Sequence, residues 1–284
     1  MKKSFLIIAV IAVAAVGLDL NRLSAAHADA LCSAKTTYQE LRRERPTGPE
    51  LKEEFHQSYP LTATGVVSIA NINGEVRIGV WDGAGVKVDA VKRARDQESL
   101  SEVTIDVVNT ADSVRIKTKY PEQNSSERRR GNSASVDYVL TIPRAARLDS
   151  AELVNGSLEI EGVQGDVHAA CVNGSVTARG LGGEVKIQTV NGKVEAEVNR
   201  VDDSKGISLN SVNGSIVLVI PASASAQVRA STIHGGITND FGLQVDNSEF
   251  VGHNLDGQIG SGGPRVRLNN VNGSISIKRA GGGM

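Results

Sequence analysis

Five carboxylates in the second half of the chain have the clearest capacity for chemistry: Glu152, Glu159, Glu161, Asp166 and Glu184. Two carboxylates that flank a glycosidic bond supply the acid and the base or nucleophile of a glycan-cleaving enzyme. These residues, however, alternate with valines and other apolar residues, as the outward positions of a half-buried strand do. We therefore expect a solvated face here and no catalytic residues.

Sites for metals and cofactors are also not indicated. Asp202 and Asp203 could bind calcium, but the Gly-Gly-x-Gly-x-Asp repeat of calcium-binding β-rolls is absent from the sequence. Neither cysteine belongs to a C-x-x-C pair, and the glycines punctuate strands without opening a phosphate-binding helix. The histidines lack metal-ligand spacing such as H-x-x-x-H; they include His56, His168, His234 and His253. We expect no metal site and no cofactor.

The elements that carry these residues repeat along the chain. Val-Asn-Gly corners place Asn155, Asn173 and Asn191 at intervals of 18 residues, and related Gly-containing units fall halfway between them. Self-similarity at a fixed period is the signature of a solenoid. The repeat predicts an all-β fold with coils of 18 residues.

Each coil buries its apolar side chains against its neighbours, about 4.8 Å away. Replacing the inward Val172 with Asp should therefore cost about 3 kcal/mol or more, whereas the outward Thr177 should accept Asp. The residues that we expect to point inward are Val154, Leu158, Ile160, Val163, Val167, Ala169, Val172, Val176, Ala178, Leu181, Val185, Ile187 and Val190.

The corners have a structural explanation. Asn and Gly tolerate the positive φ of a sharp corner, and stacked Asn side chains can hydrogen-bond between coils. We interpret the Asn-Gly-Ser glycosylation sequons as a by-product of this turn chemistry. The expected structural turn residues are Asn73, Asn155, Asn173, Asn191, Asn213, His234 and Asn272.

Two departures from the period indicate insertions. The interval from Asn191 to Asn213 is 22 residues, and the excess at residues 200–206 predicts a loop extruded from one coil. The interval from His234 to Asn272 is 38 residues. Here we expect a hairpin or a long loop, placed as a lid over the open end of the solenoid, where exposed strands would otherwise template pairing.

The N-terminus resembles a secretory signal peptide. Lys2 and Lys3 precede an apolar run of 14 residues, too short to span a bilayer. The pattern Ala28-x-Ala30 predicts cleavage before Leu31, with Ala26-x-Ala28 as the alternative site. Cys32 also permits a lipoprotein, although Leu31 is a poor lipobox residue, and an oxidising compartment would permit a Cys32–Cys171 disulfide.

These features divide the chain into a signal peptide at 1–30, a polar linker or short helices at 31–60, and an N-terminal β-strand region at 61–147. The β-solenoid follows at 148–280 and a flexible tail at 281–284. We leave open whether 61–147 continues the solenoid. Net charge is −1 with both signs interspersed, which excludes the basic footprint of a nucleic-acid binder. The basic run at residues 128–130 lies among polar residues, as a solvated loop does.

Several segments together resemble one family. They include Phe55-His56-Gln57-Ser58-Tyr59-Pro60, Asn71-Ile72-Asn73-Gly74-Glu75-Val76, Trp81-Asp82 and the repeated Val-Asn-Gly corners. The resemblance is to the bacterial putative-adhesin β-strand-repeat family, DUF4097-like exported proteins of unknown function, and covers roughly residues 51–280. It implies a right-handed single-stranded parallel β-helix and brings no catalytic residues with it.

The leading functional hypothesis is a non-enzymatic exported solenoid that mediates cell-envelope or surface interaction. The expected partner is an envelope protein or a surface glycan, without nucleic acid and without stable membrane insertion after signal cleavage. The location is then the periplasm, the cell surface or the medium. The alternative is a periplasmic component of an envelope-stress or signalling system. A polysaccharide-active enzyme is the least favoured hypothesis. Sugar-binding grooves usually carry aromatic platforms, and aromatic residues make up only 3% of this sequence.

Overall fold

The computed structural model describes residues 50–121, 134–201, 205–247 and 252–281. The chain divides into Met1–Gly48 and Pro49–Met284, and the second unit contains all of the described residues. The expected signal peptide, the cleavage residues Ala28 and Ala30, Cys32, the basic run at 128–130 and the pair Asp202 and Asp203 lie outside them. Within the described residues, no helix has the length and hydropathy needed to cross a membrane.

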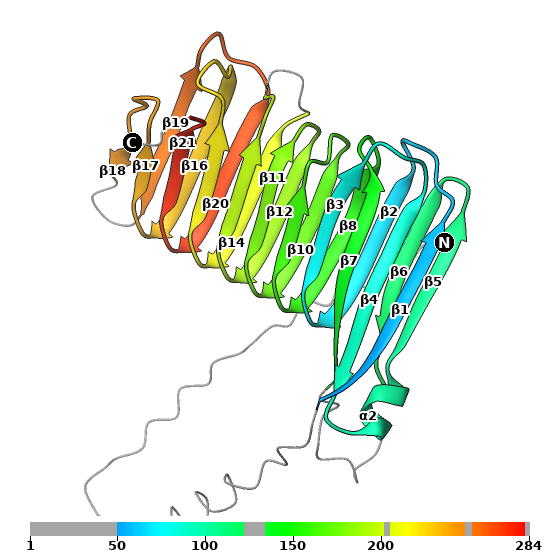
Figure 1. Cartoon of the computed structure of the whole chain (residues 1–284). Helices are drawn as coiled ribbons and strands as arrows, with labels where there is room; N and C mark the ends of the chain where they lie inside the picture. The colour runs from blue at the N-terminus through cyan, green and yellow to red at the C-terminus, as the bar shows by residue number, and fades with distance from the viewer. Residues whose placement is uncertain (1–49, 122–133, 202–204, 248–251, 282–284) are drawn as a thin grey trace, which may run out of the picture. The chain divides into compact units, whose positions relative to one another are not determined.

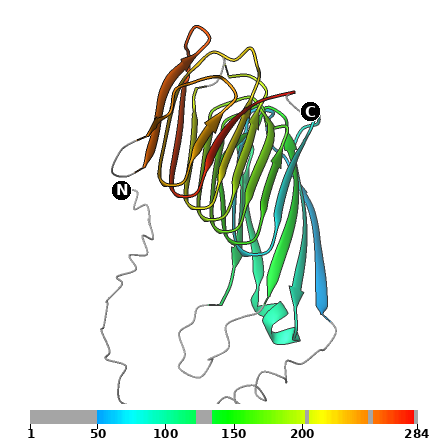
Figure 2. The same cartoon turned by 90° about the vertical axis from the view of Figure 1, so that its left-hand side faces the viewer.

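The described part of Pro49–Met284 is built from two large β-sheets that enclose one apolar core (Figures 1 and 2). We name them sheet A, with ten strands, and sheet B, with eleven. In spatial order, sheet A contains β1 (Leu51–Tyr59), β4 (Val86–Ala94), β7 (Ser135–Pro143), β3 (Val76–Trp81), β9 (Leu158–Glu161), β11 (Val176–Leu181), β13 (Val194–Val198), β15 (Ile216–Ile220), β21 (Ile275–Arg279) and β17 (Ile237–Asn239). Sheet B contains β18 (Asp246–Asn247), β19 (His253–Ile259), β16 (Ala226–His234), β20 (Arg265–Asn272), β14 (Ile207–Asn213), β12 (Val185–Asn191), β10 (Val167–Asn173), β8 (Arg147–Asn155), β2 (Val66–Asn73), β6 (Ser113–Lys119) and β5 (Thr104–Thr110).

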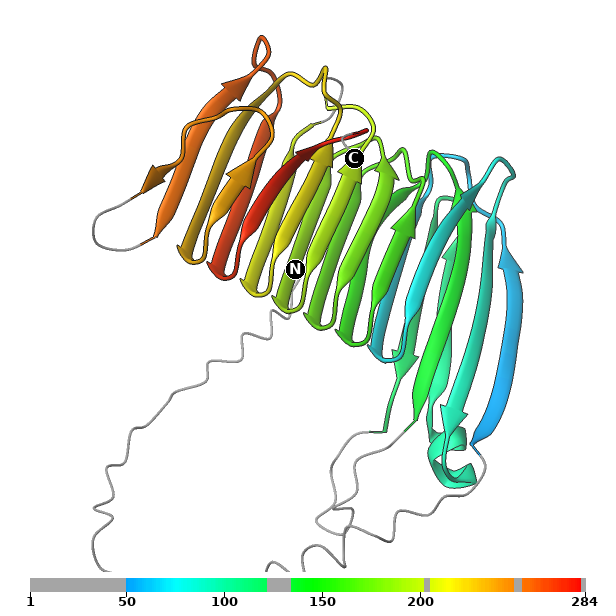
Figure 3. The same cartoon turned by 60° about the vertical axis from the view of Figure 1, so that its left-hand side comes forward.

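The repeating unit is a rung, in which a strand of sheet B turns through one tight corner into a strand of sheet A. β10 and β11 form such a rung around Asn173 and Gly174. Buried and exposed residues alternate along both strands because only one face of each sheet contacts the core. Parallel pairing stacks the rungs, and the corners align along one edge of the stack (Figure 3).

The register follows the sequence repeat in the middle of the stack. Asn155 pairs with Asn173, and Asn173 pairs with Asn191. The next partner, Asn213, is 22 residues beyond Asn191, so the insertion at 200–206 leaves the register of the corners intact. The region 61–147 joins the same stack, because β2 pairs with β8 and β3 pairs with β9.

The last rung in sequence is not the last rung in space. β20 and β21 lie between the rung of β14 and β15 and the rung of β16 and β17 (Figure 1). The 38-residue interval from His234 to Asn272 therefore holds the end of one rung, an antiparallel hairpin partner in β19, and most of the next rung. In place of the expected lid, the structure has an end rung, β16 and β17, which pairs with β20 and β21. The antiparallel strand β19 pairs with the outer side of β16.

At the opposite end, antiparallel strands extend both sheets. β1 and β4 continue sheet A beyond β7, while β5 continues sheet B beyond β6. The short helix α2 (Gln97–Glu102) buries Leu100, and Asp96 caps its start by accepting a hydrogen bond from the Ser99 amide. Residues 51–59, which we expected in a polar linker or short helices, form the strand β1. Leu51, Phe55 and Tyr59 share the face of this edge strand that packs against the core.

Three residues that we expected to point inward are exposed. The exposed fractions of Val154, Val172 and Val190 are 38%, 40% and 41%, whereas Leu153, Cys171 and Thr189 are buried. Alternation from Val167 and Ala169 carries the inward face to residue 171, so the valine of each corner faces solvent. The other ten expected inward residues are buried.

This correction reverses the expectation for residue 172. Cys171→Asp should destabilise the protein by about 3 kcal/mol or more, because it buries a charge between neighbouring rungs. Val172→Asp should cost about 1 kcal/mol or less, which reflects the low β-propensity of Asp. Urea unfolding of both variants measures the difference, and equal losses would contradict the assignment of the two faces.

Candidate interaction surface

A ladder of amide hydrogen bonds runs along the corners. The Asn173 side chain donates from Nδ2 to Oδ1 of Asn155 at 2.9 Å, and Asn191 donates to Asn173 at 2.8 Å. The same bond links every neighbouring pair of corners from Asn73 to Asn272. His234 occupies the corner of the end rung, where its register partner is Asn272. The seven expected turn residues therefore lie side by side along one edge.

The glycine after each asparagine has no room for a side chain. Gly156 has φ +141°, and a Cβ built on it would overlap the carbonyl oxygen of Gly74 in the neighbouring rung. The Gly156 amide donates to the Asn173 carbonyl at 3.0 Å in the rung on its other side. Because the corner backbones approach so closely, both the positive φ and the missing Cβ are required here.

Inside five of the seven corners, a buried polar side chain donates to a glycine carbonyl of the adjacent rung. These side chains occupy the inward position two residues before the corner residue, and their hydroxyl, thiol or amide satisfies an acceptor that is shielded from water. The bonds are Cys171 to Gly156 at 3.6 Å, Thr189 to Gly174 at 3.3 Å, Ser211 to Gly192 at 3.4 Å, Asn270 to Gly214 at 2.7 Å and Thr232 to Gly273 at 2.9 Å. Cys171 is a free, buried cysteine, and its thiol is one of these donors.

An exposed row of aliphatic side chains lies next to the asparagine ladder on the outer face of sheet B. Its members precede the corner residues by one position and are paired by the same register. Across six strand spacings the row is about 29 Å long. We call it the aliphatic row: Ile72, Val154, Val172, Val190, Val212, Val271 and Ile233. Six of the eight exposed large hydrophobic residues in the described chain belong to it.

The positions beside the aliphatic row are small or neutral. They are in register two residues earlier on each strand, and Glu152 is the one charged member: Ala70, Glu152, Ala170, Gln188, Asn210, Asn269 and Ser231. Asn269 donates to Asn210 at 2.9 Å, and Ser231 donates to Asn269 at 3.1 Å. A flat band without strong charge therefore flanks the apolar row on this side, and the asparagine ladder flanks it on the other.

The five carboxylates considered for catalysis do not lie in one group. Glu159 contacts Arg77 at 3.3 Å on sheet A, and Glu152 accepts a hydrogen bond from Ser150 at 2.8 Å on sheet B. Glu161 lies beside Arg179 in the register of sheet A. Glu159 and Glu161 are therefore outward neighbours on β9, each beside an arginine, whereas Glu152 lies on the other sheet.

Asp166 and Glu184 are the more buried members of the set. Burial raises the pKa of Asp166, but its bonds to Lys205 at 2.9 Å and to the Glu184 amide at 3.1 Å outweigh burial, so this pKa is lowered. The hydrogen bond from Lys186 at 2.9 Å, followed by that from His168 at 3.2 Å, lowers the pKa of Glu184 against the opposing effect of burial. Lowered pKa values keep both groups ionised, which suits ion pairing and does not suit a general acid.

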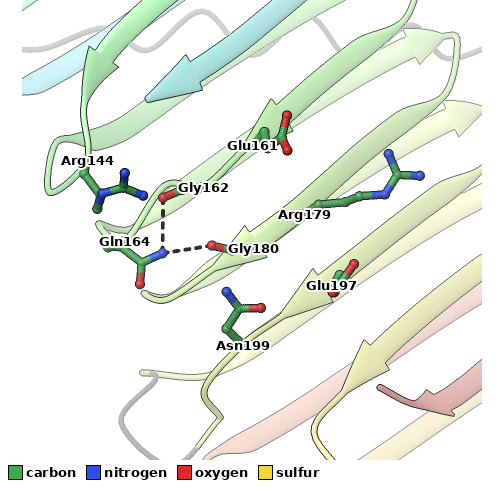
Figure 4. Close-up of a pocket in the computed structure, with 8 residues that line it drawn as sticks. All are labelled: Arg144, Glu161, Gly162, Gln164, Arg179, Gly180, Glu197 and Asn199. Carbon is green, nitrogen blue, oxygen red and sulfur yellow. Dashed lines mark hydrogen bonds between the residues drawn. The ribbon is translucent and has the colours of Figure 1, made fainter. Parts of the chain in front are cut away.

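A shallow pocket of about 360 Å³ opens at the edge of sheet A opposite the corners, beside Glu161 (Figure 4). Gln164 spans it by donating to the carbonyl oxygens of Gly162 at 3.1 Å and Gly180 at 2.9 Å. Its charged lining consists of two guanidinium and two carboxylate groups: Arg144, Arg179, Glu161 and Glu197. Arg179 also binds Glu195 at 3.1 Å and Arg144 binds Asp82 at 3.0 Å. This balance leaves no excess charge to attract an ionic substrate.

The histidines are dispersed over the described chain. His56 bonds to Asp89 at 2.6 Å on β1, His168 bonds to Glu184 on β10, and His234 lies at the end corner. His253 begins β19. No group of three or more His, Cys, Asp and Glu residues is positioned to hold a metal ion in the described part of the chain.

Residues 149–278 match the family model described as Toastrack DUF4097. Three solved structures are similar over most of the chain. They are a "putative cell adhesion protein" from Clostridium sporogenes (14% identity, TM-score 0.47, 81% of this chain and 100% of that chain), a "putative adhesin" from Bacteroides fragilis (13%, 0.29, 80% and 97%) and a "putative lipid binding protein" from Parabacteroides distasonis (11%, 0.29, 82% and 98%). No curated protein sequence matches the chain.

Gly156→Ala should destabilise the protein by about 3 kcal/mol or more, because the new methyl group displaces one rung from its neighbour at a strained φ. Gly79→Ala is the matched control: a Cβ there has no atom within 4 Å. Its effect should stay within about 1 kcal/mol. Urea unfolding compares the two, and a tolerant Gly156 would contradict the close packing of corners.

Asp166 should contribute to stability in a pH-dependent manner. Because its folded pKa is lowered, this contribution is present above the unfolded pKa of about 3.9 and is lost as the pH falls through the folded value. Asp166→Asn should therefore flatten the acid decline in the free energy of unfolding. Asp149→Asn, an exposed aspartate on β8, should leave that decline unchanged. Identical pH profiles for the wild type and Asp166→Asn would refute the assignment.

Proposed function

We propose that this chain, whose residues 149–278 match the Toastrack DUF4097 family model, is a non-enzymatic, exported surface-interaction protein. The contact surface is the outer face of sheet B, and the aliphatic row is its centre. The partner is another cell-envelope component or a cell-surface component. The aliphatic row is the observation that carries this proposal.

The row supports an interaction because its residues have no structural need to be apolar. Elsewhere on the same strands the outward positions vary, with lysine, glutamine, serine, arginine and histidine among them. Before the corner residue, every rung instead presents Val or Ile to solvent. Aligned exposed apolar residues with a polar rim are typical of interaction sites.

The form of the row limits the partner. It is one side chain wide and about 29 Å long, with a neutral band on one side and the asparagine ladder on the other. A partner that covers it must therefore be extended, or must present a straight apolar edge across the rungs. Each ladder asparagine uses one N–H for its neighbour and retains another for such a partner.

The test introduces negative charge on this surface without loss of the fold. The double variant Val172→Asp and Val190→Asp should bind envelope fractions of the native host at least about tenfold more weakly than the wild type, because two apolar contacts are replaced by desolvated charges. Co-sedimentation of the purified chain with those fractions measures binding.

Val139→Asp is the matched control. Val139 is 48% exposed, but it lies on β7 in sheet A, away from the aliphatic row. This variant should bind as the wild type does. Undiminished binding by the double variant, or an equal loss in the control, would remove the aliphatic row from the interaction.

A further inference from the structure

A cluster of arginines lies at one end of the outer face of sheet B, separate from the aliphatic row. Arg229 on β16 and Arg267 on β20 are direct partners in the parallel register, and Gln227 and Arg265 form the next outward pair. Because partnered residues of adjacent strands are about 4.8 Å apart at Cα, the guanidinium groups share one small region. They line a pocket of about 240 Å³, whose lining also includes Gln227, Asp256 and the strand residues Val228 and Val266.

The arginines outnumber their acidic partners. Arg229 binds Asp256 on β19, with Nε at 3.0 Å from Oδ2. In register, Arg267 has Ser208 on one side and Arg229 on the other, while Arg265 and Asn269 are its outward neighbours along β20. None of these four is acidic. Among the described residues, neither Arg265 nor Arg267 forms an ion pair, so three guanidinium groups share one carboxylate.

Like charges placed directly opposite on adjacent strands destabilise a sheet. The pair of Arg229 and Arg267 carries this cost. At the same position in the next two rungs the residues are Ser208 and Lys186, and Lys186 is paired with Glu184. An anion placed between the arginines would remove the repulsion. Planar guanidinium groups bind tetrahedral oxyanions through paired N–H donors, and the Gln227 amide adds a neutral donor at the edge.

We propose that Arg229, Arg265 and Arg267 form a binding site for a phosphate or sulfate group. The two positive charges left after Asp256 is counted match a dianion. The group can belong to a free ion, a lipid headgroup or a modified polymer, since all three present the same oxygens. The site stands independently of the proposed function, because it uses different side chains from the aliphatic row.

The first experiment follows thermal unfolding of the purified chain by circular dichroism while inorganic phosphate replaces chloride at constant ionic strength. Ligand that binds only the folded state raises Tm, by about 3 °C at tenfold excess over Kd for a chain of this size. Arg265→Gln and Arg267→Gln should each lose most of this rise. Arg115→Gln should retain it, because Arg115 is an exposed arginine on β6 at the far end of the same sheet.

A second readout locates the ion. In ¹H–¹⁵N spectra, the Nε–Hε signals of Arg229, Arg265 and Arg267 should shift with phosphate and with sulfate, while that of Arg115 should not. An unchanged Tm with unshifted signals overturns the proposal. The proposal is also overturned if the Gln variants respond to phosphate as the wild type does, since that would indicate a general salt effect.

Vesicles distinguish the source of the group. Phosphatidylcholine vesicles that contain phosphatidic acid should bind the wild type and not Arg267→Gln if the natural group is a lipid headgroup. A phosphate response without vesicle binding assigns the site to a soluble or polymer-borne group. Either result supports an anion site. The proposed function is tested separately, by the Val172 and Val190 variants, so that failure of one proposal is distinguishable from failure of the other.

Discussion

The close approach of backbones at the corners is the constraint on which the other features of the stack depend. In five of the corners, the glycine amide donates to the corner carbonyl of one neighbouring rung, and a Cβ in its place would collide with the glycine on the other side; these are Gly156, Gly174, Gly192, Gly214 and Gly273. Stacking at this distance fixes the register of every strand that leaves the corner. The asparagine ladder, the buried donors and the aliphatic row are aligned because that register is shared.

The buried donors explain why polar residues occur inside an otherwise apolar core. A glycine carbonyl that faces the interior cannot reach water, and leaving it unpaired would cost about 1–3 kcal/mol. Thr189, Ser211 and Thr232 each place a hydroxyl at this point, and Asn270 places an amide. The chemistry of the donor varies between rungs while its position does not. Geometry, more than residue identity, is what the repeat preserves here.

Much of the fold followed from the sequence, because glycine, asparagine and alternating aliphatic residues report local geometry directly. Ten of the inward positions lie where the pattern indicated. The valines at 154, 172 and 190 were placed on the wrong face, because valine is more apolar than the Cys171 or Thr189 beside it. Counting by twos from Val167 would have placed them correctly.

The arginine site was not visible in the sequence. Arg229 and Arg267 are 38 residues apart and become neighbours only through the position of β20 in the sheet. Similar rungs can pair with any other rung, so their order in space is decided by long-range contacts. The repeat pattern therefore specifies that the strand edges of any two rungs can pair, but it does not specify which rungs become neighbours.

That exchanged order changes how the stack can assemble and evolve. The rung of β20 and β21 has strands from earlier in the sequence on both sides, so this C-terminal segment joins the end rung to the rest of the stack. A chain that ends before β20 leaves β14 and β16 facing each other without a partner between them. Duplicating the final repeat would not lengthen this solenoid, because the position at its end is already occupied. Growth by simple addition is open only to copies inserted within the regular middle of the stack.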